Sequence, residues 1–143
     1  MAKLDPLYVA HFRYPEEWGA DLGGESRFFF IAEGEAAGRV SGRLRGANHP
    51  RRRQDGTFEP DFQGVIETHD GATILFDWWG YGRAYPPGRR QIVLAATHVS
   101  DDERYTWLND VVCAGTGEVR VDGDDVELVL EVAELVWEPP AER

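Results

Sequence analysis

The residues of this sequence best suited to proton transfer are one carboxylate and two imidazoles. Glu67 stands in the run "FQGVIETHDGATILFDWW", between apolar and aromatic residues. An apolar setting raises the pKa of a carboxyl group, which suits acid–base catalysis near neutral pH. His98, in "AATHVS", and His49, in the loop before Pro50, would be its partners. The competing interpretation is structural: Glu67 pairs with an arginine of a neighbouring strand, His98 is a hydrogen-bonded core residue, and His49 is exposed.

Other polar and aromatic residues could hold a ligand beside these groups. Arginine binds carboxylates through two parallel hydrogen bonds, an asparagine amide orients polar groups, and tryptophan forms a flat apolar wall. The predicted ligand-binding residues are Arg43, Asp77, Trp79, Arg83, Trp107 and Asn109. The run "WWGYGRAYPPGRR", residues 78–90, predicts either a mobile aromatic flap over a ligand or packing at the end of the fold.

Six arginines gather between residues 39 and 53 of a chain whose net charge is −11. They are Arg39, Arg43, Arg45, Arg51, Arg52 and Arg53. We interpret them first as counter-charges to acids on neighbouring strands. The alternatives are a clamp on an anionic ligand and a subunit interface against an acidic surface. Nucleic acid is the poorest fit, because 26 acidic residues outnumber 15 basic ones and few aromatic residues interleave with the arginines.

Strands must position these groups, because apolar runs alternate with turn signals along nearly the whole chain. The expected strands lie in "PLYVAHF", "SRFFFIAEG", "AGRVSGRL", "FQGVIET", "ATILFDWW", "RQIVLAATHVS", "VVCAGTGEVRV" and "VELVLEV". Asp70-Gly71 and Asp122-Gly123 are typical of hairpin turns, and only residues 101–108 predict a short helix. The sequence therefore predicts one all-β domain over residues 1–143, a roughly eight-stranded antiparallel β-barrel whose closure removes exposed strand edges.

The register of the hairpin at Asp70-Gly71 decides which side chains face inward. With these two residues as the turn, Glu67 lies opposite Ile74 and shares a face with Phe76. Asp77 then lies on the opposite face, so only one of the two carboxylates points into the barrel. An eight-stranded barrel is either filled by its side chains or holds one small ligand.

The last apolar run, residues 126–138, fits both the periodicity of a helix and that of a strand. Its glutamates recur at helical spacing, but its β-branched content and the preceding turn favour a strand with a bulge near Ala133. Outward glutamates on this strand and the arginine cluster would give the surface separated charges, which predicts a homodimer across a two-fold axis. The alternative is that the two patches neutralise each other within one barrel.

Several function classes are disfavoured by what the sequence lacks. No apolar run approaches the roughly 18 residues that span a bilayer, and "MAKLDPLYVAHF" does not predict a signal peptide. Gly-rich phosphate loops, the G-x-S-x-G elbow, dinucleotide fingerprints and paired metal-binding histidines are missing, so we expect no cofactor and no metal. Cys113 is the single cysteine; we expect a buried, inert thiol and, because no internal disulfide can form, a cytoplasmic protein.

Three stretches resemble a known family. "DGTFEPDFQGVIETHDGATI", "ERYTWLNDVVCAGTGEVR" and "VELVLEVAEL" are similar to the bacterial and fungal domain-of-unknown-function family 3237, over a span from Ser26 to Val136. The resemblance implies a small β-barrel without a settled activity. The chain departs from the family pattern at "GANHPRRR", where His49 stands near a position that the family often fills with Asp. His69 likewise replaces an acid that is common before the turn.

Together these observations predict a barrel that binds a small molecule. Aromatic walls, few polar groups and no cofactor motif favour a cofactor-independent isomerase, cyclase or lyase acting on an aromatic or polyketide-like compound. On this hypothesis Glu67 is the acid or base, Asn109 and Arg83 orient the substrate, and Trp79 and Trp107 form walls. The alternative is a non-catalytic binding or carrier protein with the same pocket and no perturbed acid. The sequence leaves open which of the two it is.

Overall fold

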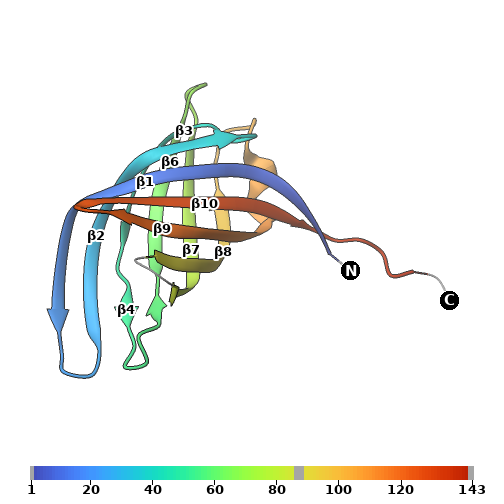
Figure 1. Ribbon diagram of the computed structural model, residues 1–143. Coiled ribbons are helices and arrows are strands. Elements are labelled where there is room, and N and C mark those ends of the chain that lie inside the picture. Colours follow the sequence, from blue (N-terminus) through green and yellow to red (C-terminus); the bar gives the residue numbers. More distant parts are fainter. Residues whose placement is uncertain (1, 86–88, 142–143) are drawn as a thin grey trace.

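The chain forms a closed antiparallel barrel in the computed structural model, which describes residues 2–85 and 89–141. The strands of the circuit are β1 (Lys3–Asp21), β2 (Ser26–Gly38), β3 (Gly42–Asn48), β6 (Asp61–Thr68), β7 (Thr73–Tyr85), β8 (Arg89–Val99), β9 (Val112–Asp122) and β10 (Asp125–Val136). Each pairs with the next in this order, and β10 pairs with β1, so the circuit closes without a free edge (Figure 1). The predicted eight-stranded barrel is confirmed.

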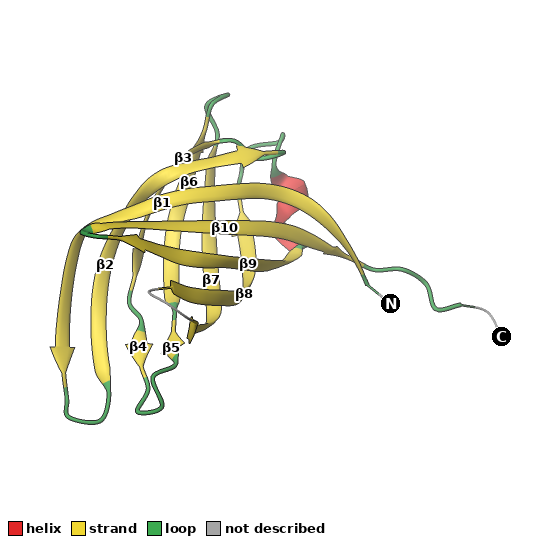
Figure 2. Ribbon diagram, in the orientation of Figure 1, coloured by secondary structure: helices red, strands yellow, loops and turns green. Residues whose placement is uncertain are grey.

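A short hairpin that the sequence did not predict extends the barrel at one end. β4 (Arg51–Arg52) continues the line of β3 and pairs with β2, while β5 (Phe58–Glu59) leads into β6 and pairs with β7. Pro50 and Pro60 stand at the two breaks, where a residue without an N–H interrupts the ladder. Figure 2 shows this hairpin beside the β1–β2 hairpin, away from the only helical turn of the described residues.

The opposite end of the barrel is closed by a 3-10 turn. This turn, η1 (Thr106–Asp110), replaces the helix predicted over residues 101–108, and the described residues contain no α-helix. Leu108 is fully buried, and Leu7 and Val40 join it in the core. η1 therefore closes this end of the barrel, because its one buried side chain, Leu108, is inserted there.

The hairpin between β6 and β7 has a longer turn than predicted. The Thr68 amide donates to the Ala72 carbonyl and the Gly71 amide donates to the Thr68 carbonyl, so three residues form the loop. Gly71 supplies the positive φ, 90°, that such a loop needs at its last position. Glu67 consequently pairs with Thr73 rather than Ile74. The predicted register is wrong by one residue, and such a slip exchanges which side chains of β6 share a face with Ile74, Phe76 and Trp78 of β7.

The C-terminal run is a strand, as predicted. Leu128, Leu130 and Val132 of β10 are buried in the core, while Glu131 is exposed. The irregularity expected near Ala133 lies in the partner strand instead, because the pairing of β1 with β10 shifts between Pro6 and Tyr8, which lie opposite Ala133 and Val132.

An aromatic layer divides the barrel interior into two halves. Phe12, Phe62, Phe76 and Trp78 come from β1, β6 and β7, and each is at most 4% exposed. Their rings contact each other: the centroids of Phe76 and Trp78 are 4.3 Å apart, and those of Phe62 and Trp78 are 4.9 Å apart. On the η1 side of this layer the barrel is filled. On the side of the β4–β5 hairpin it opens into a cavity.

Candidate ligand-binding site

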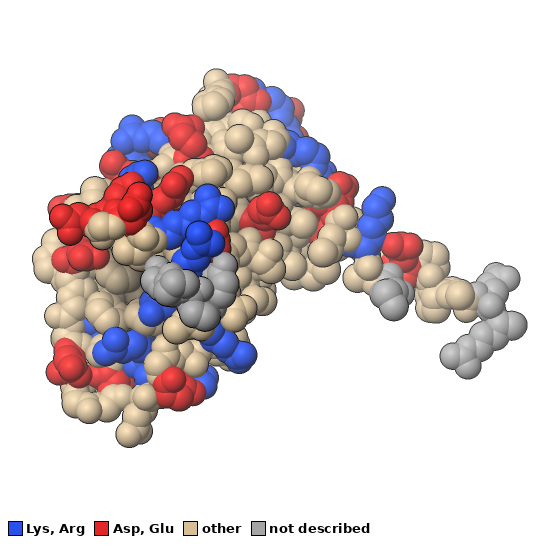
Figure 3. Space-filling model, in the orientation of Figure 1, with Lys and Arg blue, Asp and Glu red and all other residues tan. Residues whose placement is uncertain are grey.

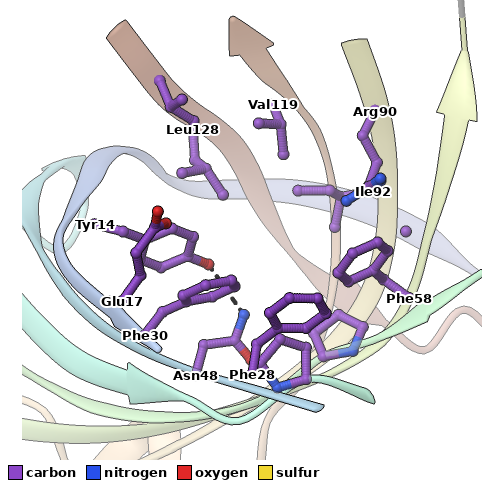
Figure 4. A pocket seen from close by; sticks show the side chains of 14 residues that line it. Tyr14, Glu17, Phe28, Phe30, Asn48, Phe58, Arg90, Ile92, Val119 and Leu128 are labelled. Carbon is purple, nitrogen blue, oxygen red and sulfur yellow. Dashed lines mark hydrogen bonds between the residues drawn. The ribbon is translucent and has the colours of Figure 1, made fainter. Parts of the chain in front are cut away.

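The open half of the barrel contains a cavity of about 200 Å³. Strands β1, β2, β3, β5, β8, β9 and β10 contribute side chains to its wall, as Figure 4 shows. Most of the lining is aliphatic or aromatic, including Ile92, Val119 and Leu128. An engineered apolar cavity of about 150 Å³ binds benzene, so this space is large enough for a compound of one or two rings.

One wall of the cavity is a run of stacked aromatic rings. Tyr14 stacks on Phe30 with centroids 4.5 Å apart, and Phe30 lies 5.6 Å from Phe28. Phe28 in turn stacks on Phe58 at 5.5 Å. Phe28 and Phe30 share a face because they alternate along β2, whereas Phe29 between them faces outward and is 42% exposed. The wall thus offers a flat apolar surface of the kind that binds a planar ring.

The polar group closest to the base of this wall is the Tyr14 hydroxyl. Asn48, which is buried, donates from Nδ2 to this oxygen at 3.0 Å and accepts the Asp61 amide at its own Oδ1. Burial raises the pKa of Tyr14 far above its ordinary value, so the hydroxyl keeps its proton. Because the hydroxyl accepts from Asn48, it retains a proton that it can donate to a ligand.

Arg90 of β8 faces the cavity from the opposite side. Its guanidinium carbon lies 3.7 Å from the centroid of the Phe58 ring, and its Nε is buried without a hydrogen-bond partner. Burial, and then the positive charge of Arg52, lower the pKa of Arg90 from its ordinary value. Gly82 makes room for the stacked side chain, since a Cβ there would lie 3.1 Å from the Arg90 Cδ.

Glu17 is the one acidic residue among the described residues that line the cavity. It belongs to β1 and lies near Tyr14 and Phe30, across the cavity from Arg90 (Figure 4). The side chain is exposed at the mouth. The cavity therefore combines an aromatic wall, a phenol, a carboxylate and an unpaired guanidinium.

The closed half of the barrel contains a polar cluster of a different kind. Tyr8 and His98 are hydrogen-bonded through the hydroxyl and Nε2 at 2.7 Å, and the Trp78 indole donates to the same hydroxyl at 3.2 Å. Burial lowers the pKa of His98 to about 4, and its Nδ1 has no partner. Neither Tyr8 nor His98 lines the cavity of the open half.

Glu67 and His49, two of the three predicted catalytic residues, lie on the outside of the barrel. Glu67 forms an ion pair with Arg45 at 3.0 Å, which is the structural alternative for this residue. His49 is exposed and packs against Phe29 at 5.9 Å. Only His98 points inward, on the face shared with Leu94 that its spacing predicted. The register slip at Gly71 explains the displacement of Glu67.

The predicted ligand-binding residues also lie outside the cavity. Arg43 is 3.7 Å from Glu33 on the outer surface. Asp77, Trp79 and Arg83 alternate along the outer face of β7 and are exposed. Trp107 and Asn109 belong to η1 at the other end, where Arg39 lies over the Trp107 ring and Asn109 bonds the Ser100 backbone. Pro86 and Pro87 of the predicted flap lie outside the described residues, and the flanking segments are the strands β7 and β8.

The arginine cluster is neutralised within the chain, with one exception. Acids lie within 4.0 Å of Arg39, Arg43, Arg45, Arg51 and Arg53. The contact of Arg39 with Glu134 of β10 joins the two patches that the sequence analysis had separated. Figure 3 shows acidic and basic side chains close together over much of one face. This pairing favours the alternative to a charge-driven homodimer, and the homodimer itself stays a prediction.

The remaining sequence predictions concern Cys113, metal sites and membrane spans. Cys113 is fully buried, and burial raises the pKa of its thiol to about 11. Among the described residues, no group of three or more histidine, cysteine and acidic side chains is placed to hold a metal ion. Within the same part of the chain, no helix is long and apolar enough to cross a membrane.

The residues that line the cavity are not among the predicted site residues, although several of them left a signal in the sequence. Extending the inward face of Leu94 and Ile92 by two residues reaches Arg90, which therefore had to face the interior. Alternation likewise places Phe28 and Phe30 on one face. Tyr14 continues the inward face of Ala10 and Phe12 in the same way. Glu17 left no comparable signal, because the pairing of β1 with β2 shifts between Arg13 and Glu16.

Comparison with solved structures supports the same architecture. A β-barrel-like protein from Acinetobacter baumannii AYE aligns with a TM-score of 0.80 and 19% identity, covering 94% of this chain and 96% of that one. A conserved protein of unknown function from Rhodopseudomonas palustris gives 0.82 and 18%, covering 95% and 99%. An enzyme from Penicillium herquei gives 0.70 and 23%, covering 92% and 94%. At these identities the likeness shows the fold.

The sequence comparisons give a family without an assigned activity. No curated protein has a sequence that matches this chain. The model of the family described as protein of unknown function DUF3237 matches residues 2–135, a longer span than the resemblance indicated. With nearly the whole chain matched and the barrel in common, this protein belongs to the DUF3237 family.

Proposed function

We propose that the open half of the barrel binds a small, planar aromatic molecule and acts on it by acid–base chemistry without a cofactor. The observation that carries this proposal is the cavity of about 200 Å³ behind the Tyr14–Phe30–Phe28–Phe58 wall. Pockets for small molecules combine apolar walls with a few convergent polar groups. The likeness in fold to an enzyme from Penicillium herquei supports an enzymatic function.

The reaction class follows from the polar groups at the two sides of the cavity. Glu17 can remove a proton from a carbon next to a ligand carbonyl, and the Tyr14 hydroxyl can donate a hydrogen bond to the oxygen on which negative charge then develops. Return of the proton at another position gives an isomerisation. Attack of the enolate carbon on a second carbonyl group of the same molecule, followed by return of the proton to the alkoxide that forms, gives a cyclisation. Neither outcome needs an oxidant or a reductant.

The alternative function is that of a non-catalytic carrier. It is favoured by the exposure of Glu17, because water competes with a ligand for an exposed carboxylate, whereas catalytic sites usually exclude water. A carrier would use the same aromatic wall and the same Tyr14 hydrogen bond. The two functions therefore agree on binding and differ in whether a proton moves.

Binding is tested by calorimetric titration with 2-naphthol at pH 7. The wild-type protein should bind it saturably, and Phe30→Ala should weaken binding about tenfold because it removes the central ring of the wall. Phe29→Ala is the matched control, since the neighbouring ring faces outward. Equal affinity of the two variants, or no binding at all, would overturn the proposed site.

Catalysis is tested with 2-tetralone, an aromatic ketone with an acidic C–H group. In D₂O the wild-type protein should accelerate the exchange of this hydrogen, followed by NMR, and Glu17→Gln should slow the accelerated rate about a hundredfold. Binding without acceleration would leave the carrier function.

We also propose a cytoplasmic location for the protein, which the single buried Cys113 suggests, and localisation of a tagged protein tests it.

A further inference from the structure

We propose that the ligand of the open half carries an oxyanion, a carboxylate or a phosphate, and that Arg90, assisted by Arg52, binds it at the mouth of the cavity. This inference rests on the proposed function and adds the charge of the ligand. It is carried by the position of Arg90 in the walls of two spaces, one apolar and one polar.

Arg90 is an exception in a protein that pairs most of its arginines. Within the described residues, no acid lies within 4.0 Å of the side chains of Arg52, Arg83 or Arg90. Arg83 is exposed to water on the outer face and needs no partner. Arg90 is half-buried, and its Nε has neither a protein partner nor access to solvent. Buried donors are nearly always hydrogen-bonded, so an unmatched one indicates a missing acceptor.

Among the described residues, Arg90 alone lines both of these spaces. On one side is the aromatic cavity, and on the other is a polar basin of about 470 Å³ whose wall includes Ser26, Arg52, Arg53 and Asp21. Arg53 is neutralised by Asp55, and Asp21 is exposed at the basin wall. Arg52 donates to the Ser26 hydroxyl at 3.0 Å and keeps its charge unpaired. The uncompensated charge of the basin is therefore positive on the side of Arg90 and Arg52.

Stacking fixes the direction in which Arg90 can bind. Its guanidinium carbon lies 3.7 Å from the Phe58 centroid, while that of Arg52 lies 6.0 Å from the Phe28 centroid. A guanidinium held against a ring directs its N–H groups outward in its own plane, which suits an oxyanion attached to a molecule lying along the same wall. Burial, and then the charge of Arg52, lower the pKa of Arg90 in the free protein, and such an anion would offset both effects.

The experiment compares three ligands that share one ring system. Calorimetric titration at pH 7 uses 2-naphthol, 2-naphthoate and 2-naphthyl phosphate with the wild-type protein, Arg90→Gln and Arg83→Gln. In the wild type at least one anion should bind about tenfold tighter than 2-naphthol, because a charge-assisted hydrogen bond discriminates by at least this factor. The anion with the higher affinity distinguishes a carboxylate from a phosphate site.

The variants separate the anion site from the aromatic site. Arg90→Gln should reduce the affinity for the preferred anion about tenfold more than it reduces the affinity for 2-naphthol, whereas Arg83→Gln, which removes the same charge from the outer face, should change neither. If Arg90→Gln does not fold, Arg90→Met keeps an apolar side chain against Phe58 and gives the same comparison.

Two results overturn the anion site while the proposed function stands: 2-naphthol binding without preference for an anion, and an anion preference that survives in Arg90→Gln. If none of the three compounds binds to the wild type, the proposed function and the anion site are overturned together.

Discussion

The same strands build both halves of the barrel, but one half is closed and the other contains a cavity. β8 contributes His98 to the closed half and Arg90 to the open half, and β1 contributes Tyr8 and Tyr14 in the same way. In the closed half the Tyr8 hydroxyl contacts both His98 and Trp78. In the open half the Tyr14 hydroxyl contacts Asn48 alone and faces a cavity.

The difference between the halves lies in what closes each end. η1 inserts Leu108 into one end, whereas the β1–β2 and β4–β5 hairpins lengthen the wall at the other end (Figure 2). Each half leaves one nitrogen without a partner, His98 Nδ1 in the sealed half and Arg90 Nε beside the cavity. Only the second belongs to a residue that lines the cavity. Sealing a barrel end thus separates a structural polar cluster from one available for binding.

The largest expected effect comes from the aromatic layer between the halves. Trp78→Ala should lower the free energy of unfolding by about 4 kcal/mol, because it empties the centre of the layer. Trp79→Ala, its neighbour on the outer face, should change it by less than about 1 kcal/mol. Urea denaturation of both variants measures this contrast. Equal losses would show that the layer does not divide the barrel as described.

The next effect is a pH dependence that belongs to the closed half alone. Burial lowers the pKa of His98 from 6.5 to about 4. Between these pH values His98 is therefore protonated in the unfolded chain and neutral in the folded protein. Stability from this residue is complete above pH 6.5 and is lost as the pH falls towards 4, in total about 3 kcal/mol. Denaturation at several pH values should show this loss in the wild type and not in His98→Gln. The same slope in both proteins would assign it to other groups.

A pair of tyrosine variants compares the two hydroxyls directly. Tyr8→Phe should destabilise the fold by about 2 kcal/mol, because it leaves both the Trp78 indole and His98 without their partner. Tyr14→Phe should cost about 1 kcal/mol, since only Asn48 loses an acceptor, and should weaken 2-naphthol binding. Thermal unfolding and calorimetric titration separate the two effects. Weaker ligand binding in Tyr8→Phe would contradict the separation of the halves.

The smallest effect is expected on the outer surface. Glu67→Gln breaks an ion pair with Arg45 whose two side chains are about half exposed, so it should cost less than about 1 kcal/mol and leave the exchange of 2-tetralone unchanged. The same exchange assay used for Glu17→Gln measures it. A large loss of exchange in Glu67→Gln would restore the role that the sequence alone suggested for this residue.

The strands and their closure follow from the sequence because they depend on local patterns. Alternation along β8 and β10 identifies the inward residues Leu94, His98, Leu128 and Leu130, and each of them is buried. A meander of such strands closes into a barrel because an open sheet would leave edges unpaired. The partnership of the clustered arginines with acids of neighbouring strands is also a consequence of composition, since acids are in excess.

The candidate site was decided by tertiary structure. One extra residue in the turn at Gly71 moved Glu67 to the outside, and turn length is set by backbone geometry that "DG" alone does not specify. Tyr14, Asn48, Phe58 and Arg90 come from four different strands or strand ends, and no local pattern relates them. Whether an end of the barrel is filled depends on how Leu108 of η1 and the β4–β5 hairpin pack against it. These side chains come from distant parts of the chain, so only the folded structure determines whether they fill a barrel end.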